Sequence, residues 1–218
     1  MRTGQPCSAQ AKTPEDLAQR RADFMWAMKD NAALVAGEVY EKGGFAASRR
    51  LLDVGCGPAT FSIEFARRTP SLEVTLVDIA EVISVAMKHV YDAGLTPQFA
   101  TMAGDFRTVP FGVAQYDTAF VSHVTHMYDA GENRKLLSKV WQALAPSGRV
   151  VMHDFVLSDD GVHPVETALF AVNMLVGSCG GRCYSAREMF DWLLEAKFVN
   201  PRLVPLQGDT SLIMAEKR

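Results

Sequence analysis

The sequence lacks the features that would place it in several broad classes of protein. Its longest apolar stretch, near Ala168–Val176, is interrupted by Asn173 and is too short to cross a membrane. The first residues contain no apolar segment of the kind found in secretory signal peptides. The net charge is only −3, from 22 basic and 25 acidic residues. We therefore expect a cytoplasmic protein that has neither a membrane nor a nucleic acid as its partner.

Cysteine is scarce, and its four positions contain no CxxC pair. Cys7 and Cys56 are isolated, whereas Cys179 and Cys183 are four residues apart in a glycine-rich turn. This spacing permits a disulfide but does not indicate a disulfide framework. Free thiols in a reducing compartment are therefore the expectation.

The composition that remains is that of a globular domain. The chain has 218 residues, of which 48% are apolar and 22% are charged, and this excludes long disordered or low-complexity architectures. Residues 1–12 are predicted to be a loose leader. Thr13 is predicted to cap a helix that has Pro14 in its first turn, and Asn31 to cap a second helix. Gly43 and Gly44 should end the second helix.

From residue 50 onward, apolar runs of strand length alternate with helical segments. Strands are predicted at 51–54, 73–77, 97–101, 118–122 and 150–153, and helices at 58–68, 80–93, 131–144 and 185–196. Nearly unbroken Val, Leu and Ile strands between helices are typical of a parallel sheet covered on both faces. Residues 198–206 and 210–215 are predicted to add an antiparallel hairpin. The sequence thus predicts an α/β fold, with residues 1–47 as leader and helices and residues 48–218 as the main domain.

A glycine loop follows the first predicted strand, in the segment Asp53-Val54-Gly55-Cys56-Gly57. Glycines let the backbone turn sharply and let a ligand approach it closely. Asp78 ends the next strand, where its carboxylate can accept both hydroxyls of a ribose. Asp105 and Phe106 follow the third strand, where an acid and an aromatic ring can hold an adenine.

The residues around this loop discriminate between nucleotide-like ligands. The dinucleotide pattern G-x-G-x-x-G requires a third glycine where this chain has Thr60. A pyrophosphate bound at the helix start would also lie close to the negative charge of Asp53. S-adenosylmethionine carries a sulfonium, an ammonium, a ribose and an adenine, so it fits the acids better. A nicotinamide oxidoreductase is disfavoured for the same reasons.

Together these motifs resemble those of class I S-adenosylmethionine-dependent methyltransferases. More narrowly, the chain from about Phe24 onward is similar to the catalytic domain of the caffeate, hydroxyindole and bacterial polyketide type of small-molecule O-methyltransferases. The further motifs that carry the similarity are His126 with Glu132-Asn133-Arg134 and Leu136-Leu137, Gly180-Gly181-Arg182 with Tyr184-Ser185, and Ser211–Met214.

The resemblance implies a Rossmann-like, doubly wound sheet of seven strands with helices on both faces. Its strand order would be 3-2-1-4-5-7-6, with strand 7 antiparallel. It also implies that S-adenosyl-L-methionine is the cofactor and S-adenosyl-L-homocysteine the product. The cofactor-binding residues implied are Asp53, Gly55, Gly57, Asp78, Ile79, Asp105, Phe106 and Ser122.

Two histidines, His123 and His126, follow the fourth predicted strand. One hypothesis is a metal site completed by His153 or Asp154, but a strand-to-loop junction is expected to splay the two rings, so no metal is predicted. The other hypothesis is a general base. A phenol has a pKa near 10, so a histidine that takes its proton would make it a better methyl acceptor.

The resemblance assigns the base to His126 and an orienting carboxylate to Asp154. A second family carboxylate is replaced in this chain by Cys183, so the catalytic arrangement of the plant enzymes is incomplete. The acceptor-binding residues implied are Phe24, Met28, Met127, Asn173 and Met174. Apolar and sulfur-rich walls suit a flat aromatic molecule, although ordinary core packing also explains the apolar residues of segment 158–183.

The expected function is therefore methyl transfer from S-adenosylmethionine to a hydroxyl of a small aromatic or polyketide-like molecule. Two alternatives stay open: an N- or C-methyltransferase on the same scaffold, and a non-catalytic cofactor-binding relic or regulatory subunit, which Cys183 favours. Members of this family usually carry a helical dimerisation domain before the catalytic domain, and we expect this chain to be without a full one. It stays open whether the chain forms a homodimer and whether it is a truncation.

Overall fold

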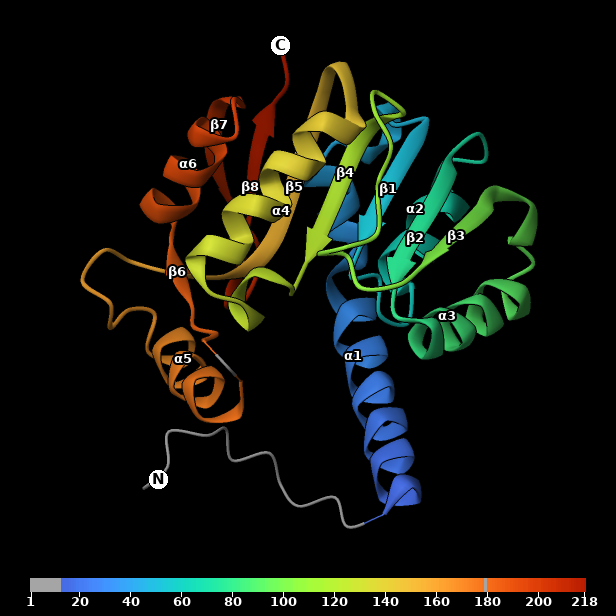
Figure 1. Ribbon diagram of the computed structural model, residues 1–218, viewed down its shortest axis with the longest axis horizontal. Coiled ribbons are helices and arrows are strands. Elements are labelled where there is room, and N and C mark those ends of the chain that lie inside the picture. The colour runs from blue at the N-terminus through green and yellow to red at the C-terminus, as the bar shows by residue number, and fades with distance from the viewer. Residues whose placement is uncertain (1–12, 179) are drawn as a thin grey trace.

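The computed structural model describes residues 13–178 and 180–218, apart from the side chains of residues 14–24, 26 and 27 (Figure 1). The predicted leader at 1–12, Cys7, Cys179 and the side chain of Phe24 lie outside the described residues. The helices are α1 (Pro14–Lys42), α2 (Thr60–Arg68), α3 (Ala80–Asp92), α4 (Ala130–Ala143), α5 (Val165–Gly177) and α6 (Ala186–Glu195), with short 3-10 helices η1 (Phe45–Ala47), η2 (Thr96–Gln98) and η3 (Thr125–Met127). The strands are β1 (Arg50–Val54), β2 (Glu73–Asp78), β3 (Phe99–Ala103), β4 (Tyr116–Ser122), β5 (Leu144–Leu157), β6 (Tyr184–Ser185), β7 (Val199–Pro205) and β8 (Thr210–Glu216).

The strands form one sheet in the order β3-β2-β1-β4-β5-β8-β7. The pairs from β3 to β5 are parallel, whereas β8 is antiparallel to both β5 and β7. The α/β fold, the five parallel strands and the C-terminal hairpin predicted from the sequence are confirmed. The two-residue strand β6 pairs with β5 beside this path, so the hairpin strands are numbered 7 and 8.

Two local predictions are wrong. Residues 14–42 form one continuous helix, and Asn31 is an exposed residue inside it rather than the cap of a second helix. Neither glycine nor proline interrupts the segment around Asn31, and an asparagine in a helix interior costs only a fraction of a kcal/mol. The third strand begins at Phe99, because Pro97 lies in the 3-10 helix η2 and has no backbone N–H for a strand ladder.

Helices cover both faces of the sheet, and each face has its own core (Figure 1). On one face α4 and α6 bury Leu137, Trp192 and their neighbours against the strands. On the other face α1, α2 and α3 bury a second cluster, in which Phe120 of β4 contacts the rings of Phe45, Phe61 and Phe65.

The parallel strands all end at one edge of the sheet, and α5 and the first half of α1 extend beyond that edge (Figure 1). In open α/β sheets the carboxyl ends of the strands are where ligands bind. This edge therefore holds the candidate site. No helix in the described part of the chain has the length and apolarity to cross a membrane.

Replacing Phe120 by alanine should destabilise the fold, because the ring is fully buried among three other aromatic rings. We expect a loss of about 3–5 kcal/mol in the free energy of unfolding, measured by urea denaturation. Leu34→Ala is the matched control, since Leu34 is 85% exposed and should change stability by less than about 0.5 kcal/mol. Equal losses in the two variants would contradict this account of the core.

Candidate active site

The glycine loop connects β1 to α2 and opens toward the carboxyl edge of the sheet. Gly57 has a φ of 51°, a left-handed conformation that favours glycine, and no atom lies within 4 Å of where its Cβ would be. Its backbone N–H donates to the Asp78 carboxylate at 3.0 Å, so the end of β2 fixes the loop. The backbone beside Gly57 is therefore free for a ligand to approach.

Two carboxylates, those of Asp53 and Asp78, lie beside this loop, and few hydrogen bonds from the described residues offset the cost of their burial. Asp53 is 2% exposed, and within the described part of the chain its hydrogen-bond donor is the Ser62 hydroxyl, at 2.6 Å. Burial raises the pKa of Asp53 to about 7, against the effect of that hydrogen bond, and the charge of Asp78 raises it further. Burial also raises the pKa of Asp78, although the backbone N–H groups of Gly57 and Ile79 donate to it. This arrangement suits a cationic ligand.

The other predicted cofactor residues differ in their exposure and in the groups that they contact. Ile79 is 40% exposed and adjoins Asp78 at the end of β2. The Asp105 carboxylate is instead held by the Arg107 guanidinium, whose Nε lies 2.9 Å from Oδ2, and this ion pair lowers the pKa of Asp105. Phe106 packs edge-on against Tyr128, with the ring centroids 5.1 Å apart. A ligand that binds Asp105 would therefore share it with Arg107.

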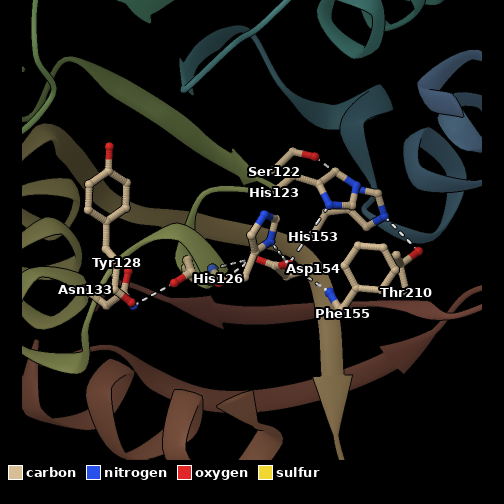
Figure 2. Close-up of polar contacts among 10 residues, drawn as sticks. Ser122, His123, His126, Tyr128, Asn133, His153, Asp154, Phe155 and Thr210 are labelled. Carbon is tan, nitrogen blue, oxygen red and sulfur yellow. Dashed lines mark hydrogen bonds and ion pairs between the residues drawn. The ribbon is translucent and has the colours of Figure 1, made fainter. Parts of the chain in front are cut away.

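His126, in the loop after β4, and Asp154, in the last third of β5, form a close pair (Figure 2). His126 lies in the short helix η3 and is 7% exposed, and its Nδ1 is 2.6 Å from Asp154 Oδ1. The other carboxylate oxygen accepts from the Thr125 hydroxyl at 2.5 Å. Burial alone would raise the pKa of Asp154, but His126, His123 and Thr125 outweigh it and hold the pKa well below its usual range.

The loop that carries His126 is fixed by contacts that the sequence did not predict. Asn133, 1% exposed in α4, donates from its side-chain amide to the carbonyls of Thr125 at 2.9 Å and Tyr128 at 3.3 Å (Figure 2). The Tyr184 hydroxyl donates to the Tyr128 carbonyl at 2.7 Å. A Cβ on Gly181 would lie 2.4 Å from the His126 carbonyl oxygen, so only glycine fits there.

The expectation that the rings of His123 and His126 splay apart is wrong. Their centroids are 5.9 Å apart, and His123 Nδ1 lies 4.0 Å from the same Asp154 oxygen that His126 contacts. His123 adopts a φ of 56°, which turns the chain back toward β5 as it leaves β4. The strand-to-loop junction thus brings both imidazoles to Asp154.

Behind this pair, His153 is fully buried and both of its ring nitrogens have partners. Nδ1 lies 3.0 Å from the Ser122 hydroxyl, and Nε2 lies 2.9 Å from the Thr210 hydroxyl of β8 (Figure 2). Burial lowers the pKa of His153 to about 3, so the ring is neutral. The Ser122 hydroxyl, predicted to contact the cofactor, is thus engaged by His153.

The predicted acceptor residues lie around the same edge. Met127 follows His126 and is 46% exposed, whereas Asn173 is exposed and Met174 half-buried in α5. Met28 is half-buried in α1. Two rings contact His126 directly: Phe170 of α5, from the apolar segment 158–183, with centroids 5.0 Å apart, and Phe155 of β5, which the sequence did not indicate, at 6.2 Å.

Comparison with known proteins identifies the family. A family model described as an O-methyltransferase domain matches residues 7–199, so the chain belongs to the family of O-methyltransferase domains. The 3-hydroxy-5-methyl-1-naphthoate 3-O-methyltransferase of Streptomyces sahachiroi is 37% identical over 148 residues, which are 68% of this chain and 42% of that protein. The L-tyrosine C(3)-methyltransferase of Streptomyces lavendulae is 32% identical over 177 residues, 81% of this chain and 46% of that protein.

A solved structure gives the same result. An O-methyltransferase family 2 protein from Planctomyces limnophilus, in complex with apigenin, matches with a TM-score of 0.77 and 26% identity, covering 95% of this chain and 67% of that one. The chain spans less than half the length of the two Streptomyces relatives. The resemblance predicted from the sequence is thus confirmed at the level of the family.

Asp53 should give the stability of the fold a pH dependence of definite sign. The folded chain keeps this proton up to a pKa of about 7, whereas the usual value is 3.8, so the folded state binds more protons between the two. The contribution of Asp53 to stability is therefore greatest at low pH and is lost as the pH rises through about 7. Asp53→Asn, which still accepts the Ser62 hydrogen bond, removes this loss.

In urea unfolding without cofactor, the advantage of Asp53→Asn over the native chain should grow by on the order of 2 kcal/mol from about pH 5 to about pH 8. Asp209→Asn changes an exposed acid and should leave the pH dependence as it is. A constant difference between Asp53→Asn and the native chain across this range would mean that Asp53 is ionised throughout.

Proposed function

We propose that this chain is the catalytic domain of an S-adenosylmethionine-dependent O-methyltransferase that acts on a small aromatic or polyketide-like hydroxyl compound. The observation that carries the proposal is the buried His126–Asp154 pair at the carboxyl edge of the sheet, the same edge at which the glycine loop opens. Residues 48–218 would form the methyltransferase domain, and the segment before them would add helices. The free, buried thiols of Cys56 and Cys183 favour a cytoplasmic protein.

The residues beside the glycine loop fit the cofactor. Burial and the charge of Asp78 raise the pKa of the Asp53 carboxylate, and a cationic ligand would offset both effects. Asp78 would accept the hydroxyls of a ribose, and the open space at Gly57 would admit a ligand to the backbone. When bound, S-adenosylmethionine supplies an electrophilic methyl group for an in-line displacement. Whether this chain forms a homodimer stays a prediction from the sequence.

The hydrogen bond between His126 and Asp154 sets the proton arrangement that a base needs. Asp154 is ionised because its pKa is lowered, so it accepts a hydrogen bond from the Nδ1–H group of His126. A neutral imidazole that carries its proton on Nδ1 has a free lone pair on Nε2. Nε2 of His126 would take the proton of the acceptor hydroxyl, and Asp154 would stabilise the imidazolium that forms.

Cys183 does not replace the family carboxylate. Burial, together with the charge of Asp154, raises the pKa of its thiol to about 12, so it stays protonated and uncharged. The base is therefore oriented by one carboxylate, and Thr125 and Asn133 provide the remaining support. This arrangement supports turnover rather than the relic hypothesis, since the base and its partner are both present and paired.

The surroundings of His126 favour a flat aromatic acceptor. Phe155 and Phe170 contact its ring, and their own ring centroids lie 4.2 Å apart. Met127 follows His126 in the chain, and Met174 lies four residues after Phe170 in α5. Aromatic and thioether side chains are common in the walls of sites for flat apolar ligands. The naphthoate named for one relative and the apigenin bound to another are both aromatic hydroxyl compounds.

Methylation of a ring carbon is the second candidate, because one relative is a tyrosine C(3)-methyltransferase. Removal of a phenol proton by His126 would also activate the carbon next to the oxygen. An NMR spectrum of the product separates the two, since an O-methyl group and a ring C-methyl group resonate in different regions. A ring C-methyl product would overturn O-methylation and leave the base assignment in place.

The cofactor assignment predicts a thermal shift. S-adenosylhomocysteine should raise the midpoint of thermal unfolding, because a ligand that binds only the folded state stabilises it by about 2.7 kcal/mol at a hundredfold excess over Kd. Asp78→Ala should remove most of that shift, whereas Asp92→Ala, a change of an exposed acid, should keep it. A shift with NAD but none with S-adenosylhomocysteine would refute the assignment.

The base assignment predicts the effect of His126→Gln. Turnover should fall by ~10²–10⁴, the usual range for loss of a positioned base, while affinity for S-adenosylhomocysteine stays within a few-fold. The loss should be smaller for acceptors whose hydroxyl is already acidic. His123→Gln is the matched control, because it leaves the His126–Asp154 hydrogen bond in place and should cost turnover much less. A His126→Gln enzyme with near-normal turnover on a neutral phenol would rule out the base.

A further inference from the structure

Three metal-ligating side chains converge at the end of β4 and β5, although the methyl transfer proposed above uses no metal. His123, His126 and Asp154 each offer one ligand atom, and these three atoms all lie within 4.8 Å of one another (Figure 2). Both histidines direct Nδ1 to the same carboxylate oxygen, His126 at 2.6 Å and His123 at 4.0 Å. Two imidazoles and one carboxylate form a donor set that Zn²⁺ and neighbouring divalent transition metals favour.

Packing contacts hold the ring of His123 in place. Its ring packs against His153, with the centroids 4.6 Å apart, and against Phe155 at 5.4 Å. His153 cannot turn toward an ion, since Ser122 and Thr210 engage both of its nitrogens. The side chain of His123 is 29% exposed, whereas those of His126 and Asp154 are 9% and 2% exposed. An ion would therefore enter past His123 and reach two nearly buried ligands.

We propose that His123, His126 and Asp154 bind a divalent transition-metal ion such as Zn²⁺, and that the bound ion switches off the base. In the metal-free site the Asp154 carboxylate that faces Nδ1 of His126 can only accept, so a neutral ring there carries its proton on Nδ1 and has its lone pair on Nε2. A metal ion that takes the Nδ1 lone pair displaces that proton to Nε2, with no net release of protons. Nε2 then carries an N–H group and cannot accept the proton of the hydroxyl.

This inference rests on the proposed function only for its inhibitory effect, since metal binding itself requires neither cofactor nor turnover. Its first test is a titration of the purified chain with Co²⁺, followed by visible absorption. We expect one Co²⁺ per chain with the ligand-field bands of low coordination number, and Zn²⁺ should abolish them. His123→Gln and His123→Ala should each weaken binding by at least about 10–100-fold.

The control variant is His163→Gln. His163 forms a His–carboxylate pair with Asp160 on the surface, so it reports on adventitious binding by an exposed imidazole. It should leave the Co²⁺ titration unchanged. Titrations that are identical for the native chain and both His123 variants, or a titration that His163→Gln alone weakens, would overturn the site.

The second test measures turnover. Zn²⁺ should inhibit the native enzyme, and EDTA should restore the rate, whereas the His123→Gln enzyme should keep most of its turnover and resist Zn²⁺. Loss of turnover in EDTA that Zn²⁺ restores would overturn the inhibitory role. If no acceptor is methylated at all, the proposed function fails, and the Co²⁺ titration still decides the metal site.

Discussion

The rest of the site depends on the hydrogen bonds that the buried carboxylate of Asp154 accepts. Asp154 is 2% exposed and accepts hydrogen bonds from the His126 ring, the Thr125 hydroxyl and the Phe155 backbone. An ionised carboxylate is costly to bury, and only several donors in good geometry offset that cost. The orientation of the His126 ring and the placement of the proton on its Nδ1 both depend on this carboxylate.

The site divides into two regions with opposite electrostatic character. Near the glycine loop, burial raises the pKa values of Asp53 and Asp78, and the causes given by the described residues include no positive charge. Near β5, His126, His123 and the Thr125 hydroxyl lower the pKa of Asp154 and outweigh the effect of burial. The first region suits a cationic ligand, and the second suits proton transfer. One sheet edge accommodates both because parallel strands deliver their carboxyl ends side by side.

The fold was largely predictable because strand-length apolar runs and helical periods alternate clearly after residue 50. The two errors in the secondary structure arose where local signals were weak. Asparagine caps helices but is also tolerated inside them, as Asn31 is, and β3 begins at Phe99, two residues after Pro97. The family motif predicted His126 and Asp154 as catalytic partners, and the two side chains lie 2.6 Å apart. Their catalytic roles stay a prediction. The approach of His123 to Asp154 and the engagement of Asp105 by Arg107 were not predictable, since they depend on a positive φ and on one rotamer.

The pairing of β8 has a consequence for the order in which the domain is completed during synthesis. β8 lies between β5 and β7, and its residues 210–216 pair with residues 149–155 of the strand that carries Asp154. Thr210 also supplies one of the two hydroxyls that hold His153. The hydrogen bonds that link the glycine loop to β2 come from residues 77 and 78, so these contacts can form much earlier in synthesis. β5, which carries Asp154, would lack its β8 neighbour until residues 210–216 leave the ribosome.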